Sequence, residues 1–386
     1  NLVTADGGKE IISGNERVLR ARLSDARFFW ELDLKTNLEV FAKKLDNLVF
    51  HTKLGSVGDK TNRLATLSKG LSNFVADSNP NSVERAAKLC KADLVTEMVS
   101  EFPDLQGVMG AHYARAQEEM EEVSCAISDH YKPQGPNDIC PTSPTSVVLA
   151  LVDKIDTLVG FFGIDEKPTG SKDPFALRRA ALGVIRLILE NQLRIPLSRV
   201  ISDAVSAYGD ELLNQVSTKN LISSLLSFIT ERLKVYLREQ GNRHDLITAV
   251  FATGFEDDLV RLLSRVDALE SFLNSDDGAN LLIAYRRAAN ILRIEEAKDG
   301  KTYTTAASKE DFIEVAEKRL MEQIVIMNGE TKNALSKEDF SGAMISMASL
   351  RHPVDDFFDQ VKVNDSNPLL RENRLRLLSN VRMAMD

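Results

Sequence analysis

The sequence predicts an all-α fold. Apolar residues recur with the helical period of ~3.6 residues along most of the chain, and no continuous set of alternating, strand-like segments emerges. No internal repeat of about 20–50 residues is evident, so a solenoid is not expected. At 386 residues the chain is long enough for two or three hydrophobic cores.

The helices of the first half follow from this periodicity, and a Pro/Gly-rich loop at 134–144 interrupts them. That loop contains Thr142 and Ser143, either of which can cap the next helix. The expected helices of this half cover residues 38–51, 82–101, 113–128, 146–162 and 175–191.

A second helical set follows, and we expect no sheet of more than two short strands anywhere. A domain seam is expected between residues 195 and 225, where Pro196 and the sequence Tyr208-Gly-Asp precede this set. Gly241 is placed to end the helix before it, and residues 298–305 form a polar turn. The expected helices cover residues 198–207, 221–240, 245–252, 257–272, 279–293, 309–328, 337–350, 354–362 and 369–385.

A Gly/Ser loop that runs into a helix at 166–191 has the features of a phosphate-binding device. Asp173 stands where an N-cap belongs and Pro174 takes the first helical position. Arg179 and Arg186, seven residues apart, share a face that we expect to stay exposed. Free backbone N–H groups at the helix start and guanidinium groups along its side both suit phosphate. The expected buried face comprises Leu177, Ala181, Val184 and Ile188.

The composition indicates a soluble protein and argues against a generally basic one. The net charge is −9, which disfavours nucleic acid, yet seven Lys/Arg face four acids between residues 165 and 200. No apolar run approaches the ~20 residues of a membrane span, and nothing at Asn1 resembles a signal peptide. Three cysteines without Cys-x-x-Cys spacing indicate reduced thiols in the cytoplasm.

The segment 167–179 resembles a hallmark of the beta subunit of bacterial heterotetrameric glycyl-tRNA synthetase. Further segments match that family in the same order and span nearly the whole chain: 14–30, 89–107, 353–361 and 370–378. Because the chain opens on Asn1 within a recognisable motif, the resemblance implies a C-terminal fragment from which roughly half of the subunit is left off.

The resemblance also implies a domain plan and a role. It implies an HD-like helical domain at 1–200 with a degenerate metal site, a helical body at 201–275, and an anticodon-binding, DALR-like helical domain at 276–386. The implied partners are tRNA(Gly) and the alpha subunit, with no membrane and no DNA. Glycine–tRNA ligase activity would belong to the alpha/beta complex. The alpha subunit would use the ATP, so this fragment is expected to need no cofactor and to be non-catalytic alone.

An HD-type phosphohydrolase is the enzyme alternative. His51 could be its first metal ligand and Asp153 or Asp156 its last. The His-Asp pair between them is missing, because the chain reads Lys91-Ala-Asp93 there. The adjacent pair His244-Asp245 follows Gly241 and is expected to start a helix. No P-loop and no Gly-x-Ser-x-Gly elbow occurs. We therefore expect neither a bound metal nor catalytic residues.

The candidate RNA contacts fall into two groups. Glycine anticodons end in two cytosines, whose N4 donor and O2 and N3 acceptors suit Arg, Asn and carbonyl or carboxylate groups. The phosphate group comprises Lys172, Arg178, Arg179 and Arg186. The anticodon group comprises Arg286, Arg287, Asn290, Arg293, Arg371 and Arg374.

Plainer interpretations stand beside these assignments. The helix at 280–293 could be an ordinary amphipathic helix whose arginines pair with nearby acids. Arg371 is expected to organise the core before it reads a base, whereas Asn373 and Arg374 are expected at the surface. An all-helical scaffold that binds only protein is the third functional option. Metal analysis separates the phosphohydrolase from the others, and salt-dependent tRNA binding separates the synthetase subunit from the scaffold.

Overall fold

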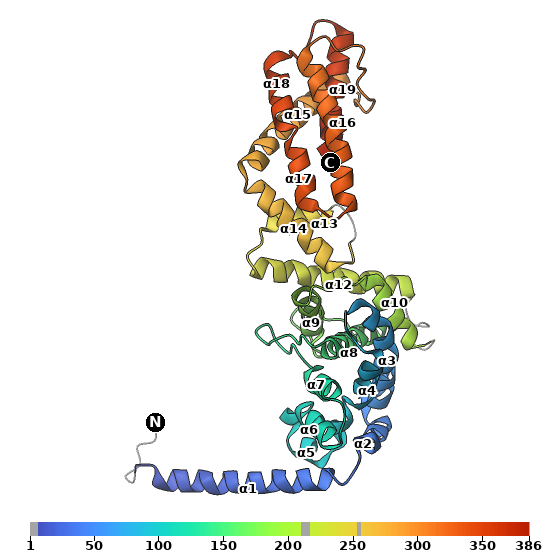
Figure 1. Ribbon diagram of the computed structural model, residues 1–386, viewed down its shortest axis with the longest axis vertical. Coiled ribbons are helices and arrows are strands. Elements are labelled where there is room, and N and C mark those ends of the chain that lie inside the picture. Colours follow the sequence, from blue (N-terminus) through green and yellow to red (C-terminus); the bar gives the residue numbers. More distant parts are fainter. Residues whose placement is uncertain (1–6, 210–216, 253–255, 386) are drawn as a thin grey trace. The chain divides into compact units, whose positions relative to one another are not determined.

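The computed structural model describes residues 7–209, 217–252 and 256–385 (Figure 1). Within these residues the chain is mainly helical, and its one sheet pairs two short antiparallel strands. The predicted all-α class is therefore confirmed. Two compact units are present, one formed by 1–240 with 257–260 and the other by 241–256 with 261–386. None of the described helices combines the length and the apolar character that a membrane crossing requires.

The first unit is built around α8 (Pro144–Gly163), a helix buried along nearly its entire length. Six helices pack against it directly: α3 (Val57–Leu71), α4 (Pro80–Leu89), α7 (Glu121–Asp129), α9 (Leu177–Glu190), α10 (Leu197–Ala207) and α12 (Thr218–Glu239). The remaining elements are α1 (Lys9–Asp33), α2 (Leu38–Lys44), β1 (Val49–His51), β2 (Gly55–Ser56), α5 (Glu97–Glu101) and α6 (Val108–Ala116). Four short 3-10 segments lie between them: η1 (Leu45–Asn47), η2 (Ser72–Phe74), η3 (Ala92–Val95) and η4 (Pro103–Leu105).

Side-chain capping divides several stretches that the periodicity merged. The segment 82–101 is α4, η3 and α5, because the Asp93 carboxylate accepts hydrogen bonds from Gly107 N at 2.5 Å and Gly110 N at 3.0 Å. Thr96 then caps α5 by accepting from Val99 N. The segment 113–128 breaks at Glu118, whose φ is 63°. The segment 38–51 ends in η1 and β1, and α1 and α3 were not among the expected helices.

The domain seam expected between 195 and 225 is wrong, because the units divide after residue 240. α10 lies within the expected seam and α12 begins within it, yet α10 packs on α3 and α8, and α12 packs on α8 and α9 of the first unit. The helix α12 stops where expected, at Gly241 with a φ of 96°. The boundaries at 200 and 275 likewise do not coincide with the division into two units. Asp210, part of the motif used to place the seam, lies outside the described residues.

The second unit is a helical bundle with its own core. Buried apolar residues of α15, α16, α18 and α19 form one cluster, which includes Leu292, Leu320, Phe357 and Leu378. Of the leucines expected in the core of the last helix, Leu375 and Leu378 are fully buried. The helices are α13 (His244–Ala252), α14 (Leu259–Leu273), α15 (Asp276–Asp299), α16 (Val315–Ser336), α17 (Phe340–Ala348), α18 (Arg351–Gln360) and α19 (Pro368–Met385).

Candidate nucleic-acid interface

The loop before α9 is a tight, pre-shaped turn. Thr169 and Lys172 exchange backbone hydrogen bonds of 3.1 and 2.9 Å, and Gly170 supplies the positive φ of 51° that closes the turn. Arg178 donates to the Gly170 carbonyl at 2.7 Å and to the Lys172 carbonyl at 3.5 Å. Arg178 therefore holds the loop in shape and leaves the tip, with Lys172, exposed to solvent.

The start of α9 differs from the expected one. The helix begins at Leu177 rather than Pro174, and the Asp173 carboxylate accepts from Leu177 N at 2.8 Å and Arg178 N at 3.0 Å. Asp173 thus caps the helix from outside it, because Ala176 has a left-handed backbone with a φ of 55°. Two of the backbone N–H groups that were expected to be free for phosphate are already occupied.

The four predicted phosphate contacts divide into two pairs with different surroundings. Lys172 and Arg179 are exposed, and neither makes an ion pair or side-chain hydrogen bond within the described residues. Arg186 is only 8% exposed, so the expectation that it shares a wet face with Arg179 is wrong. It donates to Glu190 at 2.7 Å and to the carbonyls of Gly135 and Asp138, because the loop 134–144 folds over this part of α9.

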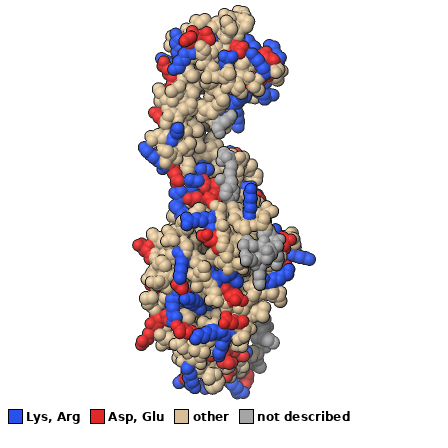
Figure 2. All heavy atoms as spheres, turned by 90° about the vertical axis from the view of Figure 1, so that its right-hand side faces the viewer, with Lys and Arg blue, Asp and Glu red and all other residues tan. Residues whose placement is uncertain are grey.

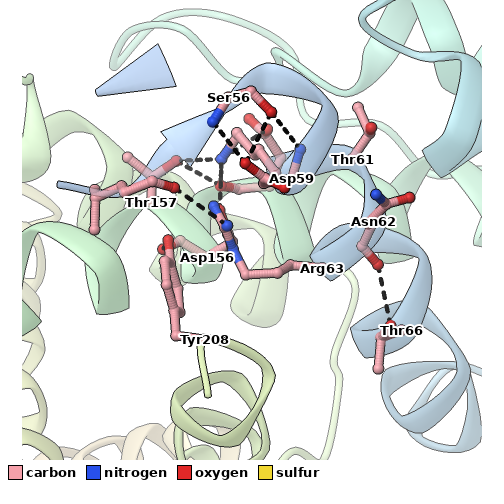
Figure 3. A network of polar contacts seen from close by, with 12 residues as sticks. Ser56, Asp59, Thr61, Asn62, Arg63, Thr66, Asp156, Thr157 and Tyr208 are labelled. Carbon is pink, nitrogen blue, oxygen red and sulfur yellow. Dashed lines mark hydrogen bonds and ion pairs between the residues drawn. The ribbon is translucent and has the colours of Figure 1, made fainter. Parts of the chain in front are cut away.

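A buried ionic network lies where the degenerate metal site was expected. Asp153 Oδ1 lies 3.3 Å from Lys60 Nζ and 3.2 Å from Lys91 Nζ. The side chain of Asp156 is fully buried and pairs with Lys60 Nζ at 3.0 Å and Arg63 Nε at 2.7 Å. Figure 3 shows Arg63 reaching Asp156 from α3, while the ring of Tyr208 lies alongside the guanidinium, 3.9 Å from it.

Lysine ammonium groups form ion pairs with the carboxylates that would otherwise bind a metal ion. Burial by itself raises the pKa of the Asp153 carboxyl, but Lys60 and Lys91 outweigh it and hold that pKa well below its usual range. His51, the other candidate ligand, accepts a hydrogen bond at Nδ1 from Lys53 N at 3.2 Å. No cluster of three or more His, Cys, Asp or Glu suited to a metal occurs within 7–209, 217–252 and 256–385.

The helix α15 presents free cationic groups. Leu281, Ala288 and Leu292 bury one face of the helix. Arg286, Asn290 and Arg293 lie on the exposed side, and in the described part of the chain none of the three has a side-chain partner. The alternative that these arginines pair with nearby acids is therefore wrong for Arg286 and Arg293. Arg287 is also exposed, but its guanidinium lies over the Phe358 ring at 4.3 Å.

Two of the arginines of α19, Arg371 and Arg374, hold the bundle together. Arg371 pairs with Glu295 at 2.5 Å and Asp299 at 2.7 Å, in agreement with an organising role. Arg374 is 4% exposed and pairs with Glu317 and Asp365, so its expected surface position is wrong. Asn373 is buried as well, and exchanges hydrogen bonds of 2.7 and 2.9 Å with the backbone of Ser308.

The sequence reasoning missed the β1–β2 hairpin, whose first strand lay inside an expected helix. A local signal for it exists. Gly55 has a φ of 84°, and Ser56 begins α3 through a reciprocal capping box with Asp59. The sequence Gly-Ser-x-x-Asp therefore indicated a turn and a new helix at this point. On the face seen in Figure 2, Lys and Arg side chains are interspersed with Asp and Glu.

The chain is similar to known proteins over its whole length. Residues 1–252 match the family described as glycyl-tRNA synthetase beta subunit, and residues 281–386 match the DALR anticodon binding domain. The glycine–tRNA ligase beta subunit of Rhodospirillum centenum is 52% identical over 100% of this chain and 54% of its own length. That of Phenylobacterium zucineum is 50% identical over 100% of this chain and 55% of its own length. The chain thus spans about half the length of the curated relatives it matches.

Proposed function

This chain belongs to the family of glycyl-tRNA synthetase beta subunits, and from that premise we propose that it is the tRNA-binding part of such a subunit. It positions tRNA(Gly) and recognises the anticodon for glycylation carried out in the cytoplasm together with an alpha subunit. The observation that carries the proposal is the unpaired, exposed set Arg286, Asn290 and Arg293 on α15, within the region that matches an anticodon-binding domain.

The chemistry of this set fits cytosine. An arginine donates to the O2 and N3 acceptors of the base, and an asparagine carbonyl accepts from the N4 amino group. The free-energy cost of bringing an unpaired guanidinium to RNA is small, because no ion pair with a protein carboxylate has to be broken. Arg371 and Arg374 already have carboxylate partners, so we assign them to stabilising the bundle that holds α15.

Of the four predicted phosphate contacts in the first unit, we retain the two free cations, Lys172 and Arg179. Arg178 supports them indirectly, since it fixes the carbonyls of the turn that carries Lys172. Phosphate contacts of this kind fix the position of the RNA and carry no sequence information themselves.

The direct test is binding of the purified chain to tRNA(Gly) at several salt concentrations, with a tRNA whose anticodon lacks the two cytosines as competitor. We expect tighter binding of tRNA(Gly) and a linear fall of log K with log salt. Equal affinity for both RNAs at every salt concentration would contradict anticodon recognition, and salt-independent affinity would contradict phosphate contacts. No binding of either RNA would favour the protein scaffold.

Catalysis is assigned to the complex rather than to this chain. Neither an ATP-binding motif nor a catalytic constellation was found in the sequence, and we propose that ATP is used by the alpha subunit. Incubation of the purified chain with glycine, ATP and tRNA(Gly) is expected to give no glycyl-tRNA until the alpha subunit and the remainder of the beta subunit are added. Glycyl-tRNA formed by the chain alone would overturn this assignment.

A further inference from the structure

Two turns that are far apart in the sequence rest on one aromatic cluster in the first unit. Phe161, near the end of α8, stacks against Phe175 of the loop before α9, with ring centroids 4.0 Å apart. His51 of β1 meets both rings edge-on, at 5.4 Å from Phe161 and 5.8 Å from Phe175. The cluster therefore fixes the β1–β2 turn relative to the loop that carries Lys172.

Hydrogen bonds and packing also hold the β1–β2 turn. Lys53 N donates to His51 Nδ1 at 3.2 Å, and Leu54 N donates to the His51 carbonyl at 3.0 Å. Leu54 is 4% exposed and packs beside Gly160, where a Cβ would lie 3.0 Å from the Leu54 side chain. With the backbone held in this way, the free group at the tip is the ammonium of Lys53, which is exposed and has no ion-pair or hydrogen-bond partner within the described residues.

The neighbouring acids leave this cationic character largely intact. Asp59, beside the β1–β2 hairpin, accepts hydrogen bonds from the backbone N–H and the hydroxyl of Ser56, both at 2.8 Å. Asp165 pairs with Lys167 at 2.9 Å, and Asp173 is occupied by the cap of α9. Glu166 is the remaining exposed acid of the loop. Three free cations, Lys53, Lys172 and Arg179, oppose this single negative charge. The aromatic cluster or the hydrogen bonds of Arg178 hold the elements next to them in place.

We propose that the β1–β2 turn and the turn Thr169–Lys172 form one phosphate-binding surface, in which Lys53 contacts the tRNA backbone. This inference rests on the proposed function. It adds Lys53 and the β1–β2 turn, which the proposed function does not include. The expected ligand is the RNA sugar-phosphate backbone rather than a protein. Free cations on turns held in this way, beside the hydroxyls of Thr52 and Ser171, match the donors that phosphate oxygens accept from.

Phe175 is assigned a positioning role in this surface, because it connects the two turns and carries no charge. Its replacement would leave all three cations present but release the loop from the hairpin. Lys53→Ala and Lys172→Ala should then become additive in the Phe175→Leu background, whereas we expect them to be coupled in the parent chain.

The test measures tRNA(Gly) binding against salt for Lys53→Ala, with Lys53→Arg as the conservative variant. Lys53→Ala is expected to weaken binding about three- to tenfold for cognate and non-cognate tRNA alike, and to reduce the salt slope by roughly 0.7–0.9. Lys53→Arg should retain the parent slope. Lys88→Ala, which removes another exposed lysine of this unit that is already paired with Glu84, is the matched control and should change neither quantity.

The outcomes separate this inference from the proposed function. If Lys172→Ala lowers the slope while Lys53→Ala leaves it unchanged, the hairpin lies outside the interface and the inference fails alone. If the parent chain does not bind tRNA, the proposed function and this inference both fail. Loss of binding to the alpha subunit by Lys53→Ala, with unchanged tRNA affinity, would identify a protein partner and overturn the inference. Because Phe175→Leu removes core contacts, its melting temperature is measured beside its binding, and the Lys53 variants decide the question.

Discussion

Arg374 Nε donates to Glu317 Oε1 at 2.6 Å, and the two side chains are only 5% and 1% exposed. The same guanidinium donates to the Lys362 carbonyl and to Asp365, both at 2.9 Å. Glu317 in turn accepts from Ile313 N and Glu314 N at the start of α16. One arginine of the last helix therefore ties together α16, α19 and the segment that follows α18.

Removal of Arg374 should destabilise the second unit strongly. Arg374→Met leaves Glu317 buried without its cation, and breaking a buried pair in this way costs about 3–5 kcal/mol. We expect the free energy of unfolding to fall by that amount in urea titrations. Arg293→Ala, an exposed and unpaired arginine of the same unit, should stay within about 0.5 kcal/mol of the parent. If Arg374→Met changes the free energy of unfolding only slightly, the Arg374–Glu317 pair contributes little to the stability of the second unit.

Arg286 and Asn290 should affect recognition rather than folding. Because both are exposed and unpartnered, Arg286→Ala and Asn290→Ala should leave the melting temperature unchanged. Each should weaken binding of tRNA(Gly) by about 1–3 kcal/mol and lower the preference over a tRNA without the two anticodon cytosines. Arg319→Ala, which removes an exposed arginine paired with Asp356, serves as the control. Equal losses for both tRNAs would remove Arg286 from base recognition.

Arg179 and Arg186 should behave differently although they lie seven residues apart on one helix. Arg179→Ala should weaken binding to all tRNAs alike and flatten the salt dependence, since it removes one phosphate contact. Arg186→Ala should instead lower the melting temperature, because the carbonyls of Gly135 and Asp138 lose their donor. A thermal melt and a salt titration of each variant separate the two effects. A flattened slope with unchanged stability for Arg186→Ala would contradict this division.

The carboxylates of Asp153 and Asp156 should not bind a divalent metal. Lys60, Arg63 and Lys91 already neutralise them, so a cation would have to displace buried ammonium and guanidinium groups. We expect metal analysis of the purified protein to find no stoichiometric metal, and added Mn²⁺ or Zn²⁺ not to raise the melting temperature through this site. A metal that stabilises the parent chain but not Asp153→Asn would refute the prediction and restore the phosphohydrolase alternative.

Lys154 should give the first unit a characteristic pH dependence. Its Nζ donates to the carbonyls of His130, Tyr131 and Lys132, and burial lowers the pKa of this lysine to about 8 from an ordinary 10.5. Below pH 8 the lysine is charged in both the folded and the unfolded chain. Between pH 8 and 10.5 it is charged mainly in the unfolded chain, which then binds more protons, so the contribution of this group to stability rises with pH.

The measurement compares the parent chain with Lys154→Met in urea at pH 7, 8.5 and 10. The difference in unfolding free energy between them should be constant below pH 8 and should then move in favour of the parent as the pH rises. A constant difference across the whole range would show that the folded-state pKa of Lys154 is not lowered.

The sequence by itself determined the features that depend on short-range pattern. The ~3.6-residue spacing of Leu177, Ala181, Val184 and Ile188 fixed the buried face of α9, and all four are at most 1% exposed. The same periodicity gave the all-α class, and Gly241 gave the end of α12. The motif at 167–179 was sufficient to indicate the family. Each of these inferences needs only residues within a few turns of one another.

Only the tertiary structure decided which arginines are free. Arg179 and Arg186 are equivalent by spacing, but two partners of Arg186, the carbonyls of Gly135 and Asp138, lie 51 and 48 residues away in a loop that covers the helix. Arg374 meets Glu317 from 57 residues away. A guanidinium is available to RNA only if it is not already bonded to a protein carboxylate or carbonyl. Helical periodicity does not report such distant contacts, because they depend on how the elements pack.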